Sequence, residues 1–280
     1  MLDSLMPMAR LCLLVFVVSA LFSTGSTLTV RQIVEPLRNV RLVLVSLAVS
    51  FLAVPLIAFA ITRIHPLEQP LQVGLILLSM TAGSEALPKI SGIVKGNTGY
   101  AVALMSMQII VSLVYVPLVI SMLLPQVRIN HVKLVMKLVL FVLLPLIGGL
   151  LLKARSESTA EMMEHALHKI SMVSLLLVFA LLVAIKFEVI LNILHLEVVL
   201  TVIVYLALAF AAGFLLGGPK PDTRMTLAVG SILRSGGIAL VVGSQAFSDP
   251  KVIIMIVLVL ILILPVLPAM IWMSRRFGLR

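Results

Sequence analysis

The sequence predicts an all-α polytopic membrane protein, and three observations lead to this fold class. First, 61% of the 280 residues are hydrophobic and only 11% are charged, a balance that soluble helices with a single apolar face do not reach. Second, the apolar residues occur in runs close to the ~20 residues that an α-helix needs to cross a bilayer. Third, two of these runs, one in each half of the chain, are interrupted near their middle by charged and helix-breaking residues.

Nine candidate spans follow one another, joined by short connections that leave no room for a soluble domain. A window of about 20 residues places them at residues 11–29, 41–63, 70–96, 99–124, 132–152, 168–186, 190–216, 224–247 and 252–273. The formal net charge of +10 comes mainly from Lys and Arg residues between these spans. Such residues meet anionic lipid head groups, so we expect membrane lipid as a partner and exclude nucleic acid.

The distribution of basic residues predicts the orientation. If the spans alternate in direction, the loops that begin near residues 31, 95, 153, 220 and 275 share one side and hold most of the Lys and Arg residues. Loops rich in these residues stay in the cytoplasm. We therefore expect a multi-pass protein of the cell inner (plasma) membrane, with its amino terminus outside and its carboxyl terminus in the cytoplasm.

The first span has two interpretations. Arg10 precedes an apolar run over residues 11–22, and small residues follow at 23–25, which is also typical of a cleaved secretory signal. Because apolar residues continue to Val30, we expect a retained span, and cleavage stays the alternative. Cys12 is the only cysteine, so we expect it to pack in the span and predict no disulfide framework.

The third span is interrupted by Gly83, Ser84, Glu85, Pro88 and Lys89. A charge at the centre of a lipid-exposed helix costs about 2.5–3.5 kcal/mol, and Pro88 removes a backbone donor and clashes with the preceding turn. These residues therefore need a special location. A structural alternative involves no ligand, because Glu85 and Lys89 are four residues apart and could form an ion pair on one helical face.

A polar stretch at residues 153–164 separates the fifth and sixth spans, and we expect an interfacial loop with some helix. Its end carries residues with helical spacing that could hold a metal ion, namely Glu161, Glu164, His165 and His168. At a membrane boundary a solvated amphipathic turn explains the same pattern. We therefore predict no metal site.

The eighth span is interrupted by Arg234, Ser235, Gly236 and Gly237. Glycine destabilises a helix interior, and Arg234 has no carboxylate within its own segment. Its expected partner is Glu85 from the other interruption, a carbonyl freed from a helix, or an anionic substrate.

The two interruptions occupy matching places, each in the second-last span of its half. A five-helix unit repeated once, with its first helix missing from the first copy, gives this arrangement and inverts the second copy in the membrane. We expect repeats at residues 1–124 and 125–280. Their broken helices should cross, which places residues 85–89 near 233–237. Non-helical backbone at membrane depth is tolerated when it lines a water-filled cavity, so a cavity is expected there.

The sequence resembles the bile acid:sodium symporter family, and within it the bacterial branch labelled as sodium-dependent transporters. The resemblance covers nearly the whole chain and is closest over residues 74–97, 115–119, 234–239 and 244–250. It implies two crossing broken helices, a core domain and a smaller panel domain that rock against each other, and the loss of the first of ten helices. On this basis spans one, five and six form the panel, and spans two, three, four, seven, eight and nine form the core.

The chain departs from the family at the residues that bind sodium. Family members use Ser-Asn after a Pro-Gly-Gly motif, hydroxyls in the next helix, and a Glu with a Gln in the second broken helix. The matching positions here are Leu87, Pro88, Ala101 and Met105, with no carboxylate at 229–233. A hard cation needs several oxygen ligands. No cofactor is therefore predicted, sodium stays possible without its usual ligands, and we infer that a fixed guanidinium replaces it.

The predicted function is secondary active transport of small organic anions by alternating access. A passive channel or uniporter-like exporter of the same fold is the alternative. An enzyme is disfavoured because Glu85 is the only carboxylate well inside a span, and no obligate protein partner is evident. Gly83 and Pro88 are expected to break the third span, and the expected substrate-binding residues are Ser84, Glu85, Lys89, Arg234, Ser235, Gly236 and Gly237.

Overall fold

The structure of the chain is a computed structural model that describes residues 2–29, 40–65, 67–123, 131–193, 195–247, 249–266 and 268–271. Helices make up nearly all of this part of the chain, together with one isolated β-bridge. Six of its helical stretches are long and apolar enough to cross a membrane: Pro7–Thr27, Val40–Ile64, Thr98–Ile120, Val132–Arg155, Glu157–Ile185 and Leu196–Leu216. The all-α polytopic fold class is therefore confirmed, while the number of spans and the inverted repeats stay predictions.

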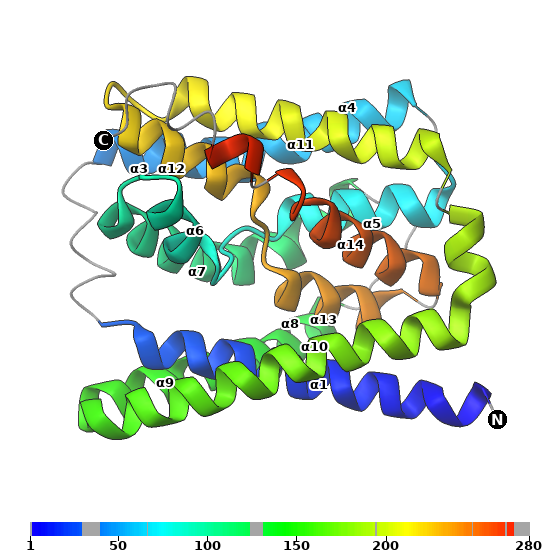
Figure 1. Ribbon diagram of the computed structural model, residues 1–280, viewed down its shortest axis with the longest axis horizontal. Helices are drawn as coiled ribbons and strands as arrows, with labels where there is room; N and C mark the ends of the chain where they lie inside the picture. The colour runs from blue at the N-terminus through cyan, green and yellow to red at the C-terminus, as the bar shows by residue number, and fades with distance from the viewer. Residues whose placement is uncertain are drawn as a thin grey trace.

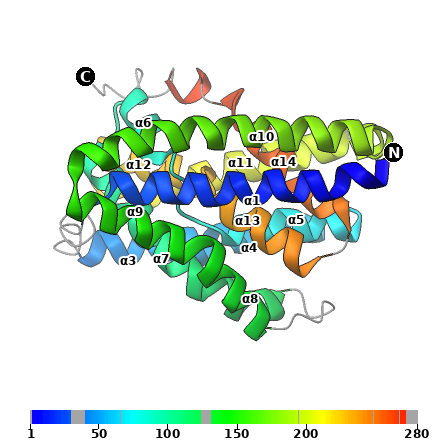
Figure 2. The same cartoon turned by 90° about the horizontal axis from the view of Figure 1, so that it is seen from below.

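The helices lie in three layers along the long axis of the molecule (Figure 1). One layer holds α1 (Leu2–Thr27), α9 (Leu144–Arg155) and α10 (Glu157–Ile193), which pack against one another in both views (Figure 2). The opposite layer holds α3 (Val40–Ala48), α4 (Val54–Ile64), α11 (Leu196–Leu216) and α12 (Pro221–Ile232). Between them lie α5 (Gln69–Met80), α6 (Leu87–Ile93), α7 (Thr98–Leu123), α13 (Gly236–Ala246) and α14 (Pro250–Leu262).

Both interrupted runs are broken helices. The first is divided into α5 and α6, and the second into α12 and α13. Pro88 occupies the first turn of α6, where its missing N–H leaves no helical bond unmade. Ser235 is the N-cap residue of α13, and its hydroxyl accepts a hydrogen bond from the backbone N–H of Ile238 at 3.4 Å.

Two helices carry a π-helical turn just before a proline. In the second span η2 (Val49–Ala53) joins α3 to α4, and Pro55 follows it. In the fifth span η3 (Val139–Leu143) joins α8 (His131–Leu138) to α9, and Pro145 follows it. Proline has no N–H and clashes with the carbonyl four residues earlier, and a wider turn absorbs this conflict. The turn at η2 leaves backbone carbonyls free for partners from other helices.

The connection between α9 and α10 is shorter than the sequence predicts. Only Ser156 separates the two helices, so most of the polar stretch 153–164 is helical and not an interfacial loop. Lys153 forms ion pairs with Glu157 at 2.9 Å and Glu161 at 3.4 Å. The Ser156 hydroxyl also accepts a bond from the N–H of Thr159 at 3.4 Å, so a cap and side-chain pairs favour a helix here.

Candidate functional site

The two broken segments meet through their backbones at the centre of the molecule (Figure 1). Ala82 and Arg234 form an antiparallel bridge, and the N–H of Ser235 donates to the carbonyl of Thr81 at 2.8 Å. The hydroxyl of Ser112 in α7 donates to the carbonyl of Ala82 at 2.9 Å. Extended backbone inside a membrane protein needs such partners, because no lipid group supplies them. The two interruptions therefore meet, as predicted. In the first segment the contact involves residues 81 and 82, slightly before the predicted residues 85–89.

Gly83 allows α7 to lie close to the crossing. Its φ is +93°, a backbone conformation that favours glycine. A Cβ atom built on Gly83 would lie 2.7 Å from both the backbone N and the Cγ1 of Ile109. The predicted helix-breaking role of this glycine thus has two physical causes, the backbone conformation and the contact with α7.

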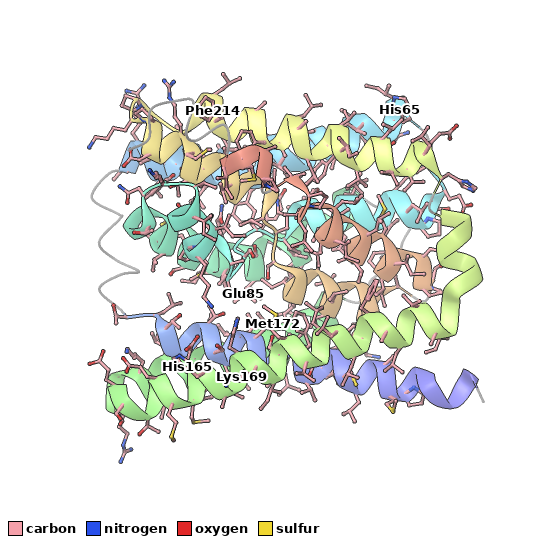
Figure 3. The ribbon with its side chains drawn as sticks, viewed as in Figure 1. His65, Glu85, His165, Lys169, Met172 and Phe214 are labelled. Atoms are coloured by element: carbon pink, nitrogen blue, oxygen red, sulfur yellow. The ribbon has the colours of Figure 1, made fainter. Side chains whose placement is uncertain are left out.

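The carboxylate of Glu85 lies on the side of the first break that faces α10 (Figure 3). The side chain is half-buried, and His168 of α10 is close enough to interact with it electrostatically. Its neighbour Ser84 is buried and accepts a hydrogen bond from the N–H of Ala86 at 3.3 Å. Glu85 is therefore positioned between the first break and the layer that contains α1, α9 and α10.

The alternative of an ion pair between Glu85 and Lys89 is not observed. The described ion pairs do not include these two side chains. The helix that carries Lys89 begins only at Leu87, so Glu85 is outside it and the two residues do not share a helical face. Lys89 is exposed, and it interacts with Glu85 electrostatically without forming an ion pair.

Arg234 is the largest side chain that is almost completely buried, with 1% of its surface exposed. Its Nη1 donates a hydrogen bond to the backbone carbonyl of Ser50 at 3.2 Å. Among the three partners expected for Arg234, the structure thus contains a carbonyl freed from a helix. Glu85 is not that partner, because no ion pair between the two is found among the described side chains.

The carbonyl of Ser50 is free for a local reason. In the π-helical turn η2, the N–H of Val54 bonds to the carbonyl of Val49. The next donor in this pattern would be residue 55, which is Pro55 and has no N–H. The adjacent carbonyl, that of Phe51, accepts a bond from the hydroxyl of Tyr115 at 2.5 Å.

The guanidinium of Arg234 is surrounded by polar groups from three further elements. Gln108 of α7 donates from Nε2 to the Ser50 hydroxyl at 2.6 Å, and the hydroxyls of Tyr205 in α11 and Tyr115 in α7 interact with the guanidinium electrostatically. Within the described part of the chain, four buried polar atoms here lack a hydrogen-bond partner: Gln108 Oε1, Tyr205 Oη, Arg234 Nε and Arg234 Nη2.

Sequence reasoning missed Ser50, Gln108 and Tyr205 as parts of this cluster. A glutamine in the middle of an apolar span is a usable signal, because polar side chains inside a membrane face the protein interior. Ser50 gave no such signal, since its backbone carbonyl and not its side chain holds the arginine. We define Ser50, Gln108, Tyr115, Tyr205 and Arg234 as the arginine cluster.

The glycines of the second break lie at the start of α13. A Cβ atom on Gly237 would lie 3.9 Å from Cγ1 of Val17 in α1, and one on Gly236 would lie 2.8 Å from Cδ1 of Leu260 in α14. Gly237 therefore places the start of α13 next to α1. This is a second place where the broken segments approach the layer of α1, α9 and α10.

The positions that match the sodium ligands of the family form an apolar contact. Leu87, Ala101, Met105 and Val229 are all buried, with 2% or less of their surface exposed. A Cβ atom on Gly230 would lie 3.3 Å from a methyl carbon of Leu87. Aliphatic groups supply no oxygen to a hard cation, so these residues do not fit a sodium ion.

The residues considered as metal ligands lie at the start of α10. His165 is exposed and contacts Glu164 at 3.1 Å, and the described residues contain no group of three or more His, Cys, Asp or Glu side chains that could hold a metal ion. One further polar cluster connects α6 to α12. The hydroxyl of Thr226 accepts a hydrogen bond from the N–H of Asn97 at 2.8 Å and contacts the hydroxyl of Ser91 at 3.0 Å.

Sequence comparisons with known proteins give a family and two relatives. Residues 13–193 match the sequence model of the Sodium Bile acid symporter family. The chain is 25% identical over 171 residues to the "Uncharacterized sodium-dependent transporter YocS" of Bacillus subtilis (strain 168), covering 61% of this chain and 53% of the relative. It is 33% identical over 132 residues to the "Probable sodium/metabolite cotransporter BASS2, chloroplastic" of Oryza sativa subsp. japonica, covering 47% of this chain and 32% of the relative.

The aligned parts thus span about half and about a third of the length of these two relatives. The family match begins within α1, at residue 13, and stops at the end of α10, so it includes the first break and leaves out the second break, between α12 and α13. It covers well over half of the chain, and the apolar helices make the protein an integral membrane protein. The chain belongs to the sodium bile acid symporter family.

Proposed function

We propose that the protein is a secondary transporter that moves small organic anions across the membrane by alternating access. The observation that carries this proposal is the backbone pairing of two broken membrane segments, between Ala82 and Arg234 and between Ser235 and Thr81. Broken helices that meet near the middle of a membrane protein expose helix ends and free polar groups to a substrate.

The charges around the first break favour an anionic substrate. The carboxylate of Glu85 faces α10, which carries His168 and Lys169, while Lys89 adds a further cation. The start of α13 contributes partial positive charge from its free N–H groups. Positive groups outnumber the single carboxylate, so a carboxylate or similar anion would be attracted to this place.

The packing of the helices suggests which of them move as a unit during transport. We propose that α1, α8, α9 and α10 form the panel and that the remaining helices form the core, with the substrate bound between them. In support, α1, α9 and α10 pack against one another, and the broken segments approach them at Glu85 and Gly237. We place the protein in the inner (plasma) membrane with its amino terminus outside, because the loops rich in Lys and Arg favour that orientation.

Sodium occurs in the printed names of both relatives, yet the matching positions in this chain are apolar. We therefore omit sodium from the proposed transport cycle. Active transport would then be driven by the exchange of one anion for another.

Uptake by proteoliposomes tests the proposed function. A panel of radiolabelled mono- and dicarboxylates is offered to vesicles that contain the purified protein, and preloaded vesicles are used to detect counterflow. We expect saturable uptake and counterflow for at least one anion. Single-channel currents in a planar bilayer, with no saturation of flux, would instead support a passive channel, and a chemically altered product would support an enzyme.

A further inference from the structure

We infer that the guanidinium of Arg234 is a built-in cation, held in an oxygen-lined site that would otherwise accept a monovalent metal ion. The site consists of the arginine cluster. The inference deepens the proposed function, because a cation that cannot leave the protein cannot couple transport to its own gradient. The binding of cations is measured without transport, so the inference about Arg234 and the proposed transport function can be disproved independently.

Arg234 carries a positive charge inside the protein. Arg234 is 1% exposed, and guanidinium is always protonated in proteins. No carboxylate forms an ion pair with it among the described residues. The charge must therefore be stabilised by dipoles, as a metal ion is when it binds to neutral oxygen atoms.

The atoms that surround the Arg234 guanidinium are neutral oxygen ligands. The Ser50 carbonyl accepts from Nη1 at 3.2 Å, and the buried hydroxyl of Tyr205 has no hydrogen-bond partner among the described residues. Gln108 holds the Ser50 hydroxyl at 2.6 Å and keeps an amide oxygen without a hydrogen-bond partner. Carbonyl, amide and hydroxyl oxygens are the neutral ligands that a hard monovalent cation takes.

The Ser50 carbonyl is free to bind a cation because of its place in the second span. Pro55 has no N–H to donate to the carbonyl of Ser50, so this carbonyl, which belongs to the π-helical turn, is free to accept from Arg234. The four elements that supply the cluster, η2, α7, α11 and the second break, are separate in the sequence. A free cation near this position would be repelled by the guanidinium, so the arginine and a metal ion exclude each other.

The wild-type protein gives the first test. Its thermal unfolding in detergent is followed in NaCl, KCl and choline chloride at equal concentration, which keeps chloride and ionic strength constant. We expect the same midpoint in all three salts, and equal binding of radioactive sodium with and without excess KCl. A midpoint that rises specifically in NaCl would overturn the inference, because a ligand that binds the folded state stabilises it.

The second test removes the built-in cation. Arg234→Ala leaves the oxygens of Ser50, Gln108 and Tyr205 in place, and we expect the midpoint of this variant to rise by a few degrees in NaCl or KCl relative to choline chloride. Arg63→Ala is the matched control, because Arg63 is exposed and lies over the ring of Phe59. If the thermal midpoint of Arg234→Ala were the same in all three salts, these oxygens would form no cation site.

Arg234→Lys covers the case in which the alanine variant does not fold. Lysine keeps a positive charge at the site, though without the planar fork of arginine. We expect this variant to fold and to remain indifferent to sodium, like the wild type. Stabilisation of the lysine variant by sodium, or failure of the charge-retaining variant to fold better than Arg234→Ala, would count against a built-in cation.

Discussion

Ala82 and Arg234 pair through their backbones, yet the side chain of Arg234 turns away from the first break and reaches the carbonyl of Ser50 at 3.2 Å. Glu85, three residues after Ala82, faces α10 on the other side of the crossing. The crossing thus separates two charges that an inspection of the sequence would place together. One charge is enclosed in the arginine cluster, and the other is half-buried next to the layer of α1, α9 and α10.

Gly83→Ala should destabilise the protein. Alanine is strained at a φ of +93°, and its Cβ would lie 2.7 Å from Ile109, so we expect a loss of about 2–4 kcal/mol in the free energy of unfolding. Thermal unfolding in detergent measures the change. Gly92→Ala is the control, because Gly92 is exposed in α6 and its Cβ would lie 3.4 Å from Thr98. Equal midpoints for the two variants would contradict the prediction.

Thr226→Val should loosen the contact between α6 and α12. The hydroxyl of Thr226 accepts from the N–H of Asn97 at 2.8 Å and contacts Ser91 at 3.0 Å. Valine has a similar volume but leaves these groups without a partner, which costs about 1–3 kcal/mol for a buried donor. Thr201→Val is the control, since its hydroxyl bonds only within its own helix, to the carbonyl of Glu197 at 2.7 Å. Hydrogen exchange at residues 91–97 should rise in the first variant and not in the second.

The broken helices could be predicted from the sequence because their cause is local. Glu85 with Pro88 in one apolar run, and Arg234 with two glycines in the other, cannot continue a lipid-facing helix. The crossing also follows from the matching positions of these breaks. Family membership was readable from the residues around the breaks, and the match over residues 13–193 confirms it.

The direction of the Arg234 side chain could not be predicted, because its cause lies in another span. The free carbonyl of Ser50 depends on Pro55 and on a π-helical turn, and a proline inside a span does not by itself predict such a turn, because Pro117 lies within the α-helix α7. The interfacial loop with some helix that the sequence predicts at 153–164 is almost entirely helical in the structure, for a different reason. A polar stretch between two apolar runs is typical of a loop, but Lys153 and Glu157 are spaced to stabilise a helix.

Glu85→Gln should lower the KM for uptake of the organic anion by about tenfold, because it removes a like charge near the proposed substrate, and should change the thermal midpoint little. The carboxylate forms no ion pair with Lys89, so its removal breaks no described structural pair, but it alters the charge that faces α10 and the proposed substrate. Uptake and thermal unfolding are measured on the same preparations. Glu68→Gln is the control, because Glu68 pairs with Lys251 at an exposed end of the molecule. An unchanged KM for Glu85→Gln would remove this residue from the proposed site.

A disulfide between α1 and α13 should stop transport by fixing the proposed panel to the core. A Cβ on Gly237 would lie 3.9 Å from Cγ1 of Val17, so the two positions are in van der Waals contact and a cross-link between them would be short. The pair Val17→Cys and Gly237→Cys is made in a chain with Cys12→Ser, and oxidised and reduced proteoliposomes are compared. We expect uptake to fall on oxidation and to recover after reduction. Ser91→Cys with Thr226→Cys is the control pair, because their hydroxyls are 3.0 Å apart within the proposed core. Motion of panel against core predicts that this second cross-link leaves uptake unchanged, whereas full activity of the cross-linked α1–α13 pair would rule that motion out.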